Sequence, residues 1–177
     1  MKRDEEEVRQ IFERYGDDLY RLCYFYMKNV HDASDAVQNT LVKLMEFGGS
    51  FESESHKKYW LLKVGVNECR QLHRQWWRKK VTAEESVTDR IGQQDISGEH
   101  ELLDRVLELP EKYRVAIFMH YYEDYTAEEI GNLMGKPAST VRSWLLRGRK
   151  LLRSALEDTD FEESKEGKAV SQWKISN

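Results

Sequence analysis

The chain has 177 residues and a net charge of −4, and 34% of its residues are charged, with only two prolines and ten glycines. This length suits one domain with a full core or two small domains, and because no β-branched or turn-rich pattern recurs at strand spacing, we expect an all-α fold. No apolar run approaches the roughly 20 residues that cross a bilayer, and the acidic first residues are unlike a signal peptide. The composition therefore predicts a cytoplasmic protein without membrane insertion.

Two helices are predicted before Gly48. Apolar side chains between Glu6 and Met27 recur mostly at helical spacings, which indicates one long helix or two short ones. The same spacing predicts a further helix from Asp32 to Phe47. A polar loop from Phe51 to His56 is expected to follow.

A third helical region, from Tyr59 to Lys80, combines basic and aromatic residues. Between Lys57 and Lys80 eight Lys or Arg residues stand against one Glu, and residues 56–80 have a net charge of +7. Positive charge follows a phosphate backbone, and flat rings stack on unpaired bases for roughly 1 to 3 kcal/mol each. The apolar first half is interpreted mainly as core, whereas the adjacent Trp76 and Trp77 are hard to bury together, so at least one is expected to be exposed. This pattern favours binding of single-stranded or partly opened DNA.

The composition changes after this helix. Residues Thr82 to Gly98 are acidic, poor in large apolar side chains and without a regular period, which predicts a flexible linker. Helices are expected at His100–Leu109 and Glu111–Tyr122, interrupted by Pro110. We therefore expect two small helical domains, residues 1–80 and 100–156, joined by an acidic linker at 81–99 and followed by a polar tail at 157–177.

Residues Thr126 to Arg153 have the pattern of a helix-turn-helix. Thr126 and Glu129 form a capping box, Gly135 is expected to turn the chain in the left-handed conformation, and Pro137 suits the first turn of the next helix. That helix has an aliphatic stripe, Val141, Leu145, Gly148 and Leu152, opposite a basic and hydroxyl face of the kind that enters the major groove. The alternative is an amphipathic surface helix with a solvated charged face. The predicted contacts to duplex DNA are Ser139, Thr140, Arg142, Ser143, Arg147 and Lys150.

Three blocks of residues give the chain a resemblance to a known family over about residues 8–155. It is similar to the extracytoplasmic-function group of bacterial sigma factors, the promoter-recognition subunits of RNA polymerase. The first block resembles the polymerase-binding helix of that group and the second its promoter-melting helix. The blocks are Asp32–Gln38; Trp60–Leu61 with Asn67 and Arg74; and Leu109–Arg114, followed by Tyr125–Gly131 and Thr140–Ser143.

The resemblance implies a two-domain protein that joins core RNA polymerase. Its first domain would bind the coiled coil of the largest polymerase subunit and open the minus-ten element. Its second domain would recognise the minus-thirty-five element and contact the flap of the second-largest subunit. The resemblance also implies an anti-sigma factor as an inhibitory partner.

The resemblance and the charge pattern together assign residues to a surface for the melted DNA strand. The residues expected to bind the melted minus-ten strand are Lys63, Asn67, Arg70, Arg74, Trp76, Trp77 and Arg78. The loop from Phe51 to Lys58 is also expected to handle this strand.

The resemblance assigns a second surface to polymerase. The residues expected to bind polymerase are Asp35, Gln38, Asn39, Leu41 and Met45. The alternative for these five is that the polar three form a solvated outer face and that Leu41 and Met45 belong to the core.

Other functions remain open at this point. A free-standing dimeric regulator could use the same helix-turn-helix, and a helical adaptor could have lost DNA binding, but the polymerase-binding block and the aromatic basic helix favour the sigma factor. We expect no enzymatic activity and no cofactor, because a glycine-rich phosphate loop and a nucleophile with a base are lacking. Cys23 and Cys69 are interpreted as reduced core thiols, and Cys69 with His73 is too small a set for a metal site.

Overall fold

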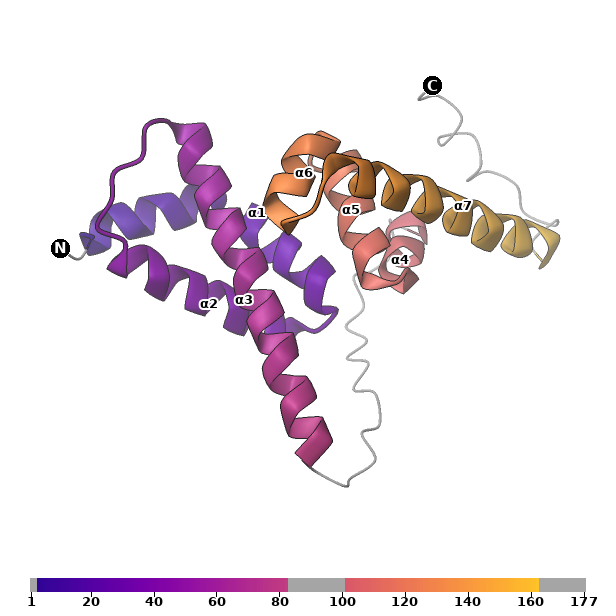
Figure 1. Ribbon diagram of the computed structural model, residues 1–177, viewed down its shortest axis with the longest axis horizontal. Coiled ribbons are helices and arrows are strands. Elements are labelled where there is room, and N and C mark those ends of the chain that lie inside the picture. Colours follow the sequence, from indigo (N-terminus) through magenta and orange to yellow (C-terminus); the bar gives the residue numbers. More distant parts are fainter. Residues whose placement is uncertain (1–2, 83–100, 163–177) are drawn as a thin grey trace.

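The computed structural model describes residues 3–82 and 101–162, and all regular structure in these ranges is helical. The helices form two bodies that lie side by side, one in indigo to magenta and one in orange to yellow in Figure 1. None of the helices in these ranges is apolar over a length that would span a bilayer. The linker expected at 81–99 falls almost entirely outside the described residues, as does most of the expected tail. The helices of the N-terminal body are α1 (Glu5–Met27), α2 (Val30–Glu46) and α3 (Glu54–Thr82); those of the C-terminal body are α4 (Glu101–Glu108), α5 (Glu111–Tyr121), α6 (Ala127–Met134) and α7 (Ala138–Glu162).

Two of the predicted helix boundaries are wrong. The third helix begins at Glu54, inside the expected polar loop, because the Ser53 hydroxyl accepts a hydrogen bond of 3.0 Å from the His56 N–H and so caps the first turn. At the other end of the chain, α7 continues to Glu162, well beyond the point where a tail is predicted. The added residues include the good helix former Glu157, whose polarity hides it in a search for apolar periodicity.

The N-terminal body is a three-helix bundle in which each helix contacts the other two. Its core is mainly apolar, and the predicted core thiols Cys23 and Cys69 are both free and fully buried within it. The side chains at its centre come from all three helices: Leu19, Leu22, Ala36, Val37, Leu44, Leu61, Leu62 and Val66.

The C-terminal body contains the predicted helix-turn-helix, formed by α6 and α7. The capping box is confirmed, since the Thr126 N–H donates to the Glu129 carboxylate at 2.8 Å and the Glu129 N–H donates to the Thr126 hydroxyl at 3.2 Å. Gly135 ends α6 in the left-handed region, with φ of 65°. The aliphatic stripe of α7 is also confirmed, because Val141, Leu145, Gly148 and Leu152 are all buried.

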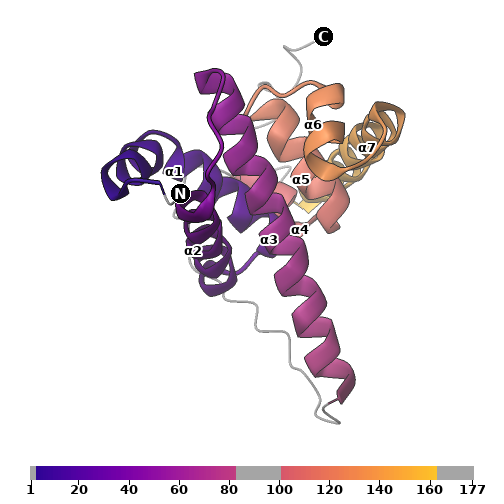
Figure 2. The same ribbon diagram turned by 60° about the vertical axis from the view of Figure 1, so that its left-hand side comes forward.

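The two bodies pack against each other, with α5 against α1 and α6 against α3. The rings of Phe25 and Phe118 stack across this junction, with centroids 3.9 Å apart and planes 6° apart. Beside them, the guanidinium of Arg114, only 7% exposed, donates to the carbonyls of Phe25 and Tyr26 at the end of α1, the second at 2.9 Å. Figure 2 shows that the C-terminal half of α3 projects beyond both bodies.

The turn of the helix-turn-helix depends on close approach at Gly131. A Cβ at this position would lie 2.5 Å from the backbone oxygen of Lys136, whose own N–H donates to the Gly131 carbonyl. Gly131→Ala therefore forces the backbone of the turn to move, and we expect it to lower the free energy of unfolding by about 1 to 3 kcal/mol. The matched control is Asn132→Ala, on the exposed neighbouring position of the same helix. Urea titrations followed by circular dichroism measure both variants, and equal midpoints would contradict the assignment.

Candidate nucleic-acid interface

The recognition face predicted on α7 is exposed. Ser139, Arg142, Ser143, Arg147 and Lys150 all lie at the surface, and Thr140 is half-buried. Because the aliphatic stripe on the opposite side of α7 is buried in the body, the basic and hydroxyl side chains are held outward along one side of a single rigid helix. The structure therefore brings these six residues together as one surface.

An acidic residue of α6 contacts this surface. The Arg142 side chain is 60% exposed and pairs with the Glu128 carboxylate at 2.7 Å. The pKa of Glu128 is lowered by its own backbone N–H at the start of α6 and by the hydrogen bond from Arg142, so Glu128 is charged in neutral solution. The residues predicted from the sequence to form this surface do not include Glu128. Nothing in the spacing of Glu128 and Arg142 along the chain indicates that the turn places them together.

Two further arginines of α7 contact tyrosines of α5. Arg147 forms a hydrogen bond with Tyr113, which lowers the pKa of the Tyr113 hydroxyl. Arg149 donates to the Tyr121 hydroxyl at 3.1 Å. Arg147 and Arg149 therefore both contact α5, and of these two only Arg147 is among the predicted DNA contacts.

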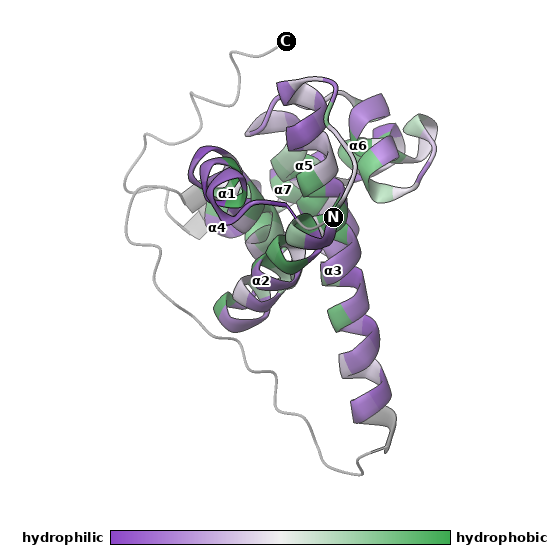
Figure 3. Cartoon of the chain, turned by 90° about the vertical axis from the view of Figure 1, so that its left-hand side faces the viewer, coloured by the Kyte–Doolittle hydropathy of each residue, from purple (hydrophilic) through white to green (hydrophobic). Residues whose placement is uncertain are grey.

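The residues predicted to bind a melted strand fall into two groups along α3. The distal group, Arg74, Trp76, Trp77 and Arg78, is exposed on the projecting half of the helix, which Figure 3 shows as mainly hydrophilic. Trp76 and Trp77 are 43% and 58% exposed, so both rings lie at the surface, where at least one was expected. Arg74 and Arg78 also line a shallow polar hollow together with Gln71 and Gln75. Charge and exposed aromatic area thus occur together on this part of α3.

The proximal group of α3 lies against the C-terminal body. Asn67 is exposed, but Lys63 and Arg70 are half-buried and donate to backbone carbonyls at the end of α6. The pKa of Lys63 is lowered by burial and by repulsion from Arg70. The seven predicted residues therefore share one helix, but the structure does not present them on one open surface.

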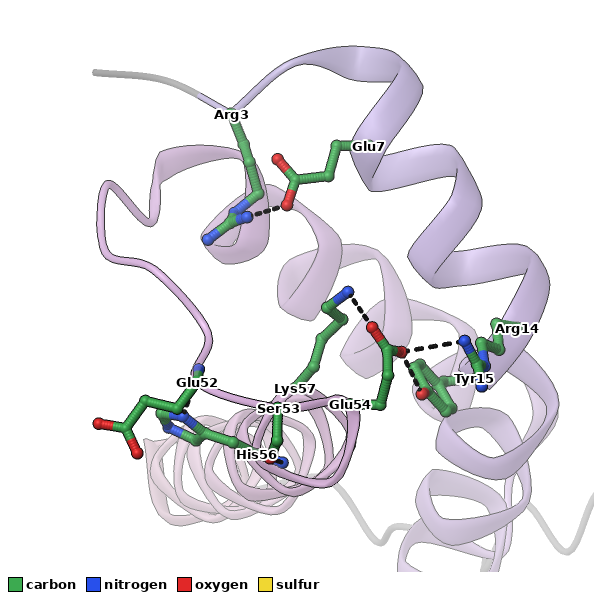
Figure 4. A network of polar contacts seen from close by, with 9 residues as sticks. All are labelled: Arg3, Glu7, Arg14, Tyr15, Glu52, Ser53, Glu54, His56 and Lys57. Atoms are coloured by element: carbon green, nitrogen blue, oxygen red, sulfur yellow. Dashed lines mark hydrogen bonds and ion pairs between the residues drawn. The ribbon is translucent and has the colours of Figure 1, made fainter.

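The first residue of α3, Glu54, is bonded to α1 (Figure 4). The Glu54 carboxylate accepts a hydrogen bond of 2.6 Å from the Tyr15 hydroxyl and pairs with Arg14 at 3.1 Å and Lys57 at 2.7 Å. The bond from Lys57, followed by that from Tyr15, lowers the pKa of Glu54, so the carboxylate stays charged and holds the start of α3 against α1. Phe51, the aromatic ring of the predicted strand-handling loop, is packed beside Phe47 and Trp60.

The residues predicted to contact polymerase lie on α2. Asp35, Gln38 and Asn39 are exposed, whereas Leu41 and Met45 are partly buried against the core. The sequence interpretation missed Val42, which is 53% exposed. It lies three and four positions after Asn39 and Gln38, on the same side of the helix, so α2 presents an apolar side chain among polar ones. The sequence did contain a signal for this: Val42 is apolar but falls outside the helical spacing of the core residues of α2.

The comparisons with known proteins agree with this arrangement. Two family models match the chain: Sigma-70 region 2 over residues 11–79 and Sigma-70, region 4 over residues 99–152. The chain is 28% identical to the ECF RNA polymerase sigma factor SigW of Bacillus subtilis, over 89% of this chain and 92% of SigW. It is 30% identical to the RNA polymerase sigma factor SigV of the same bacterium, over 83% of this chain and 89% of SigV.

A solved structure shares the fold. It is the sigma factor RpoE in complex with the anti-sigma factor NepR from Bartonella quintana, with a TM-score of 0.70 at 23% identity, covering 86% of this chain and 98% of that one. The region matches coincide with the two helical bodies, and the identity to SigV extends across both. The chain therefore belongs to the sigma-70 family as an ECF-type sigma factor with regions 2 and 4, a non-enzymatic initiation factor that directs RNA polymerase to promoters.

Proposed function

We propose that α7 recognises the minus-thirty-five element as duplex DNA. The observation that supports this is the exposed face of α7, where basic and hydroxyl side chains lie opposite a buried aliphatic stripe on the second helix of a capped helix-turn-helix. A helix presented in this way fits the major groove, where Arg can bond guanine through two atoms. The contacts are Ser139, Thr140, Arg142, Ser143, Arg147 and Lys150.

The projecting half of α3 binds the melted minus-ten strand in this proposal. Trp76 and Trp77 supply ring faces on which unpaired bases can stack, and Arg74 and Arg78 supply charge for the phosphates. Lys63, Asn67 and Arg70 extend the same basic track toward the C-terminal body. Phosphate contacts would position the strand, and base contacts would select the sequence.

The exposed side of α2 binds the coiled coil of the largest polymerase subunit. Asp35, Gln38 and Asn39 supply polar contacts, and Val42 adds apolar area to the partly buried Leu41 and Met45. A mixed polar and apolar patch of this kind is typical of protein interfaces. The C-terminal body contacts the flap of the second-largest subunit, and the protein acts in the cytoplasm, where it meets polymerase.

An anti-sigma factor completes the set of partners. Two solved structures that share this fold are complexes of this type, RpoE with NepR and CnrH with the cytosolic domain of CnrY, the second with a TM-score of 0.55 at 22% identity. The inhibitor of the present chain would bind both bodies and keep them from polymerase.

Arg142→Ala tests duplex recognition. If Arg142 bonds a guanine, its loss weakens binding of promoters with that base by about 1 to 3 kcal/mol and leaves promoters altered at that position almost unaffected. Arg149→Ala is the control, because it removes the same charge from the same helix while its guanidinium contacts Tyr121. Gel-shift titrations of the holoenzyme on a panel of minus-thirty-five variants give the comparison. Equal loss on every sequence would show that Arg142 holds phosphate instead.

Trp77→Ala tests promoter opening. Removal of a ring on which a base stacks is expected to cost about 1 to 3 kcal/mol of open-complex stability, while Trp77→Phe retains most of the stacking surface. Permanganate reactivity of unpaired thymines in the minus-ten region measures the open fraction for the holoenzyme. Normal opening by Trp77→Ala would remove Trp77 from the site.

Asp35→Lys combined with Gln38→Ala tests the polymerase face. Because both side chains are exposed, we expect the fold to remain while co-purification with core polymerase is lost. The control is Asp17→Lys combined with Gln10→Ala, which changes exposed residues of the same types on α1. Circular dichroism checks the fold of both proteins. Unchanged co-purification of the α2 variant would remove the assignment.

A further inference from the structure

Arg3, just before α1, is bonded both to the end of α2 and to the loop that follows α2. Its backbone N–H donates to the Met45 carbonyl in the last turn of α2 at 2.8 Å, and its guanidinium donates to the Gly49 carbonyl at 2.5 Å. We call residues 47–53, which connect α2 to α3, the α2–α3 loop. A side chain 46 positions away in the sequence thus holds the first half of this loop.

The α2–α3 loop folds around the Arg3 guanidinium. The guanidinium carbon lies 4.5 Å from the centroid of the Phe51 ring and 5.4 Å from that of the Phe47 ring. One of its nitrogens donates to the Glu7 carboxylate of α1 (Figure 4). Only 8% of the Arg3 side chain is exposed. Because the attraction between a cation and an aromatic ring is strongest where water is excluded, this burial strengthens the contact with the loop.

The second half of the α2–α3 loop is held by His56. The Glu52 N–H donates to His56 Nδ1 at 3.3 Å, and the His56 N–H donates to the Ser53 hydroxyl at 3.0 Å (Figure 4). The His56 ring also meets the Phe51 ring edge-on, with centroids 5.7 Å apart and planes at 90°. Phe51 therefore contacts Arg3 on one side and His56 on the other, and links the two halves of the loop.

The part of the α2–α3 loop that stays at the surface is polar. It consists of Gly48, Gly49, Ser50, Glu52 and Ser53, all of which are exposed. Hydroxyl, carboxylate and backbone groups of this kind can form hydrogen bonds with the edges of unpaired bases. They lie directly before α3, the helix proposed to bind the melted strand.

Stability alone does not account for a buried arginine at this position. Burial removes the guanidinium from water, and its buried Nε–H has no acceptor among the described residues, both of which are unfavourable. An apolar side chain of similar size would fill the same space without these costs. What the guanidinium adds is a set of bonds with fixed directions, to the Gly49 carbonyl and the Glu7 carboxylate, that are compatible with one conformation of the loop.

From these contacts we infer that Arg3 is a positioning residue for base selection in the melted minus-ten strand, and that it acts by holding the α2–α3 loop in one conformation. The inference rests on the proposed binding of this strand by the N-terminal body and adds a residue that sets its selectivity. A preformed loop loses little conformational entropy on binding, so the correct base receives the full benefit of its hydrogen bonds. A loop released from Arg3 adapts to several bases and discriminates less between them.

A spin label on the α2–α3 loop tests its conformation directly. Ser50→Cys supplies a reactive thiol at an exposed position, whereas the native Cys23 and Cys69 are fully buried. We expect Arg3→Ala to increase the mobility of a nitroxide at this position in the electron paramagnetic resonance spectrum of the full-length chain. The matched control is Arg9→Ala, which removes an exposed arginine that pairs with a glutamate of α1, as Arg3 does, and we expect it to leave the spectrum unchanged. An unchanged spectrum with Arg3→Ala overturns the inference.

Base selection is measured with the holoenzyme and fluorescent single-stranded oligonucleotides. Each carries the minus-ten sequence of one promoter with a single base changed, and anisotropy gives the dissociation constants. We expect Arg3→Ala to reduce the ratio of affinities for the preferred and the changed base at least fivefold at one or more positions, while Arg9→Ala retains this ratio. Arg3→Lys keeps the charge but lacks the planar face and the fork of donors, so we expect the same loss. Full selectivity with Arg3→Lys, or an equal loss of affinity for every oligonucleotide with Arg3→Ala, overturns the inference.

Trp77→Ala on the same oligonucleotides separates this inference from the proposed function. Weaker binding of every oligonucleotide by Trp77→Ala, together with unchanged selectivity of Arg3→Ala, overturns the role of Arg3 and leaves strand binding by α3 in place. Unchanged binding by Trp77→Ala, together with reduced selectivity of Arg3→Ala, supports the role of Arg3 and removes Trp77 from the site. Circular dichroism checks that both variants are folded.

Discussion

Carbonyl groups at the ends of two helices dictate how the two halves of this sigma factor meet. The final turns of α1 and α6 both end at the junction, and a buried carbonyl without a partner costs about 1 to 3 kcal/mol. Arg114 satisfies the first set, and Lys63 with Arg70 satisfies the second. The stack of Phe25 on Phe118 and the position of the helix-turn-helix beside α3 occur together with these bonds at the same junction.

Both surfaces proposed for DNA contain a cation that an acceptor of the same chain already engages. On α7 the partner is the Glu128 carboxylate, which is exposed and readily exchanged for a base or a phosphate. On α3 the partners are backbone carbonyls in a partly buried junction, which exchange only if the bodies separate. The first contact lies on an open surface, whereas the second lies in the junction between the two bodies.

The two segments of α3 differ in their surroundings. Its proximal segment faces α6 and stabilises the docked arrangement, while its distal segment projects with Trp76 and Trp77 exposed. Of the residues proposed to bind a melted strand, those in the distal segment are exposed, whereas Lys63 and Arg70 in the proximal segment are engaged by α6. The polymerase-binding surface that we propose on α2 lies on a different helix from both segments.

Local patterns in the sequence determined most of the helices and the internal geometry of the helix-turn-helix. Thr126 with Glu129, the left-handed Gly135 and the stripe from Val141 to Leu152 act within a few residues, so their spacing is sufficient to predict them. The residue types also predicted which face of α7 is exposed. Only the tertiary structure decided that Lys63 and Arg70 face α6, that Arg114 caps α1, and that Glu128 meets Arg142. The physical reason is that most of these cations bind backbone carbonyls, which every residue has and which therefore leave no mark in the sequence.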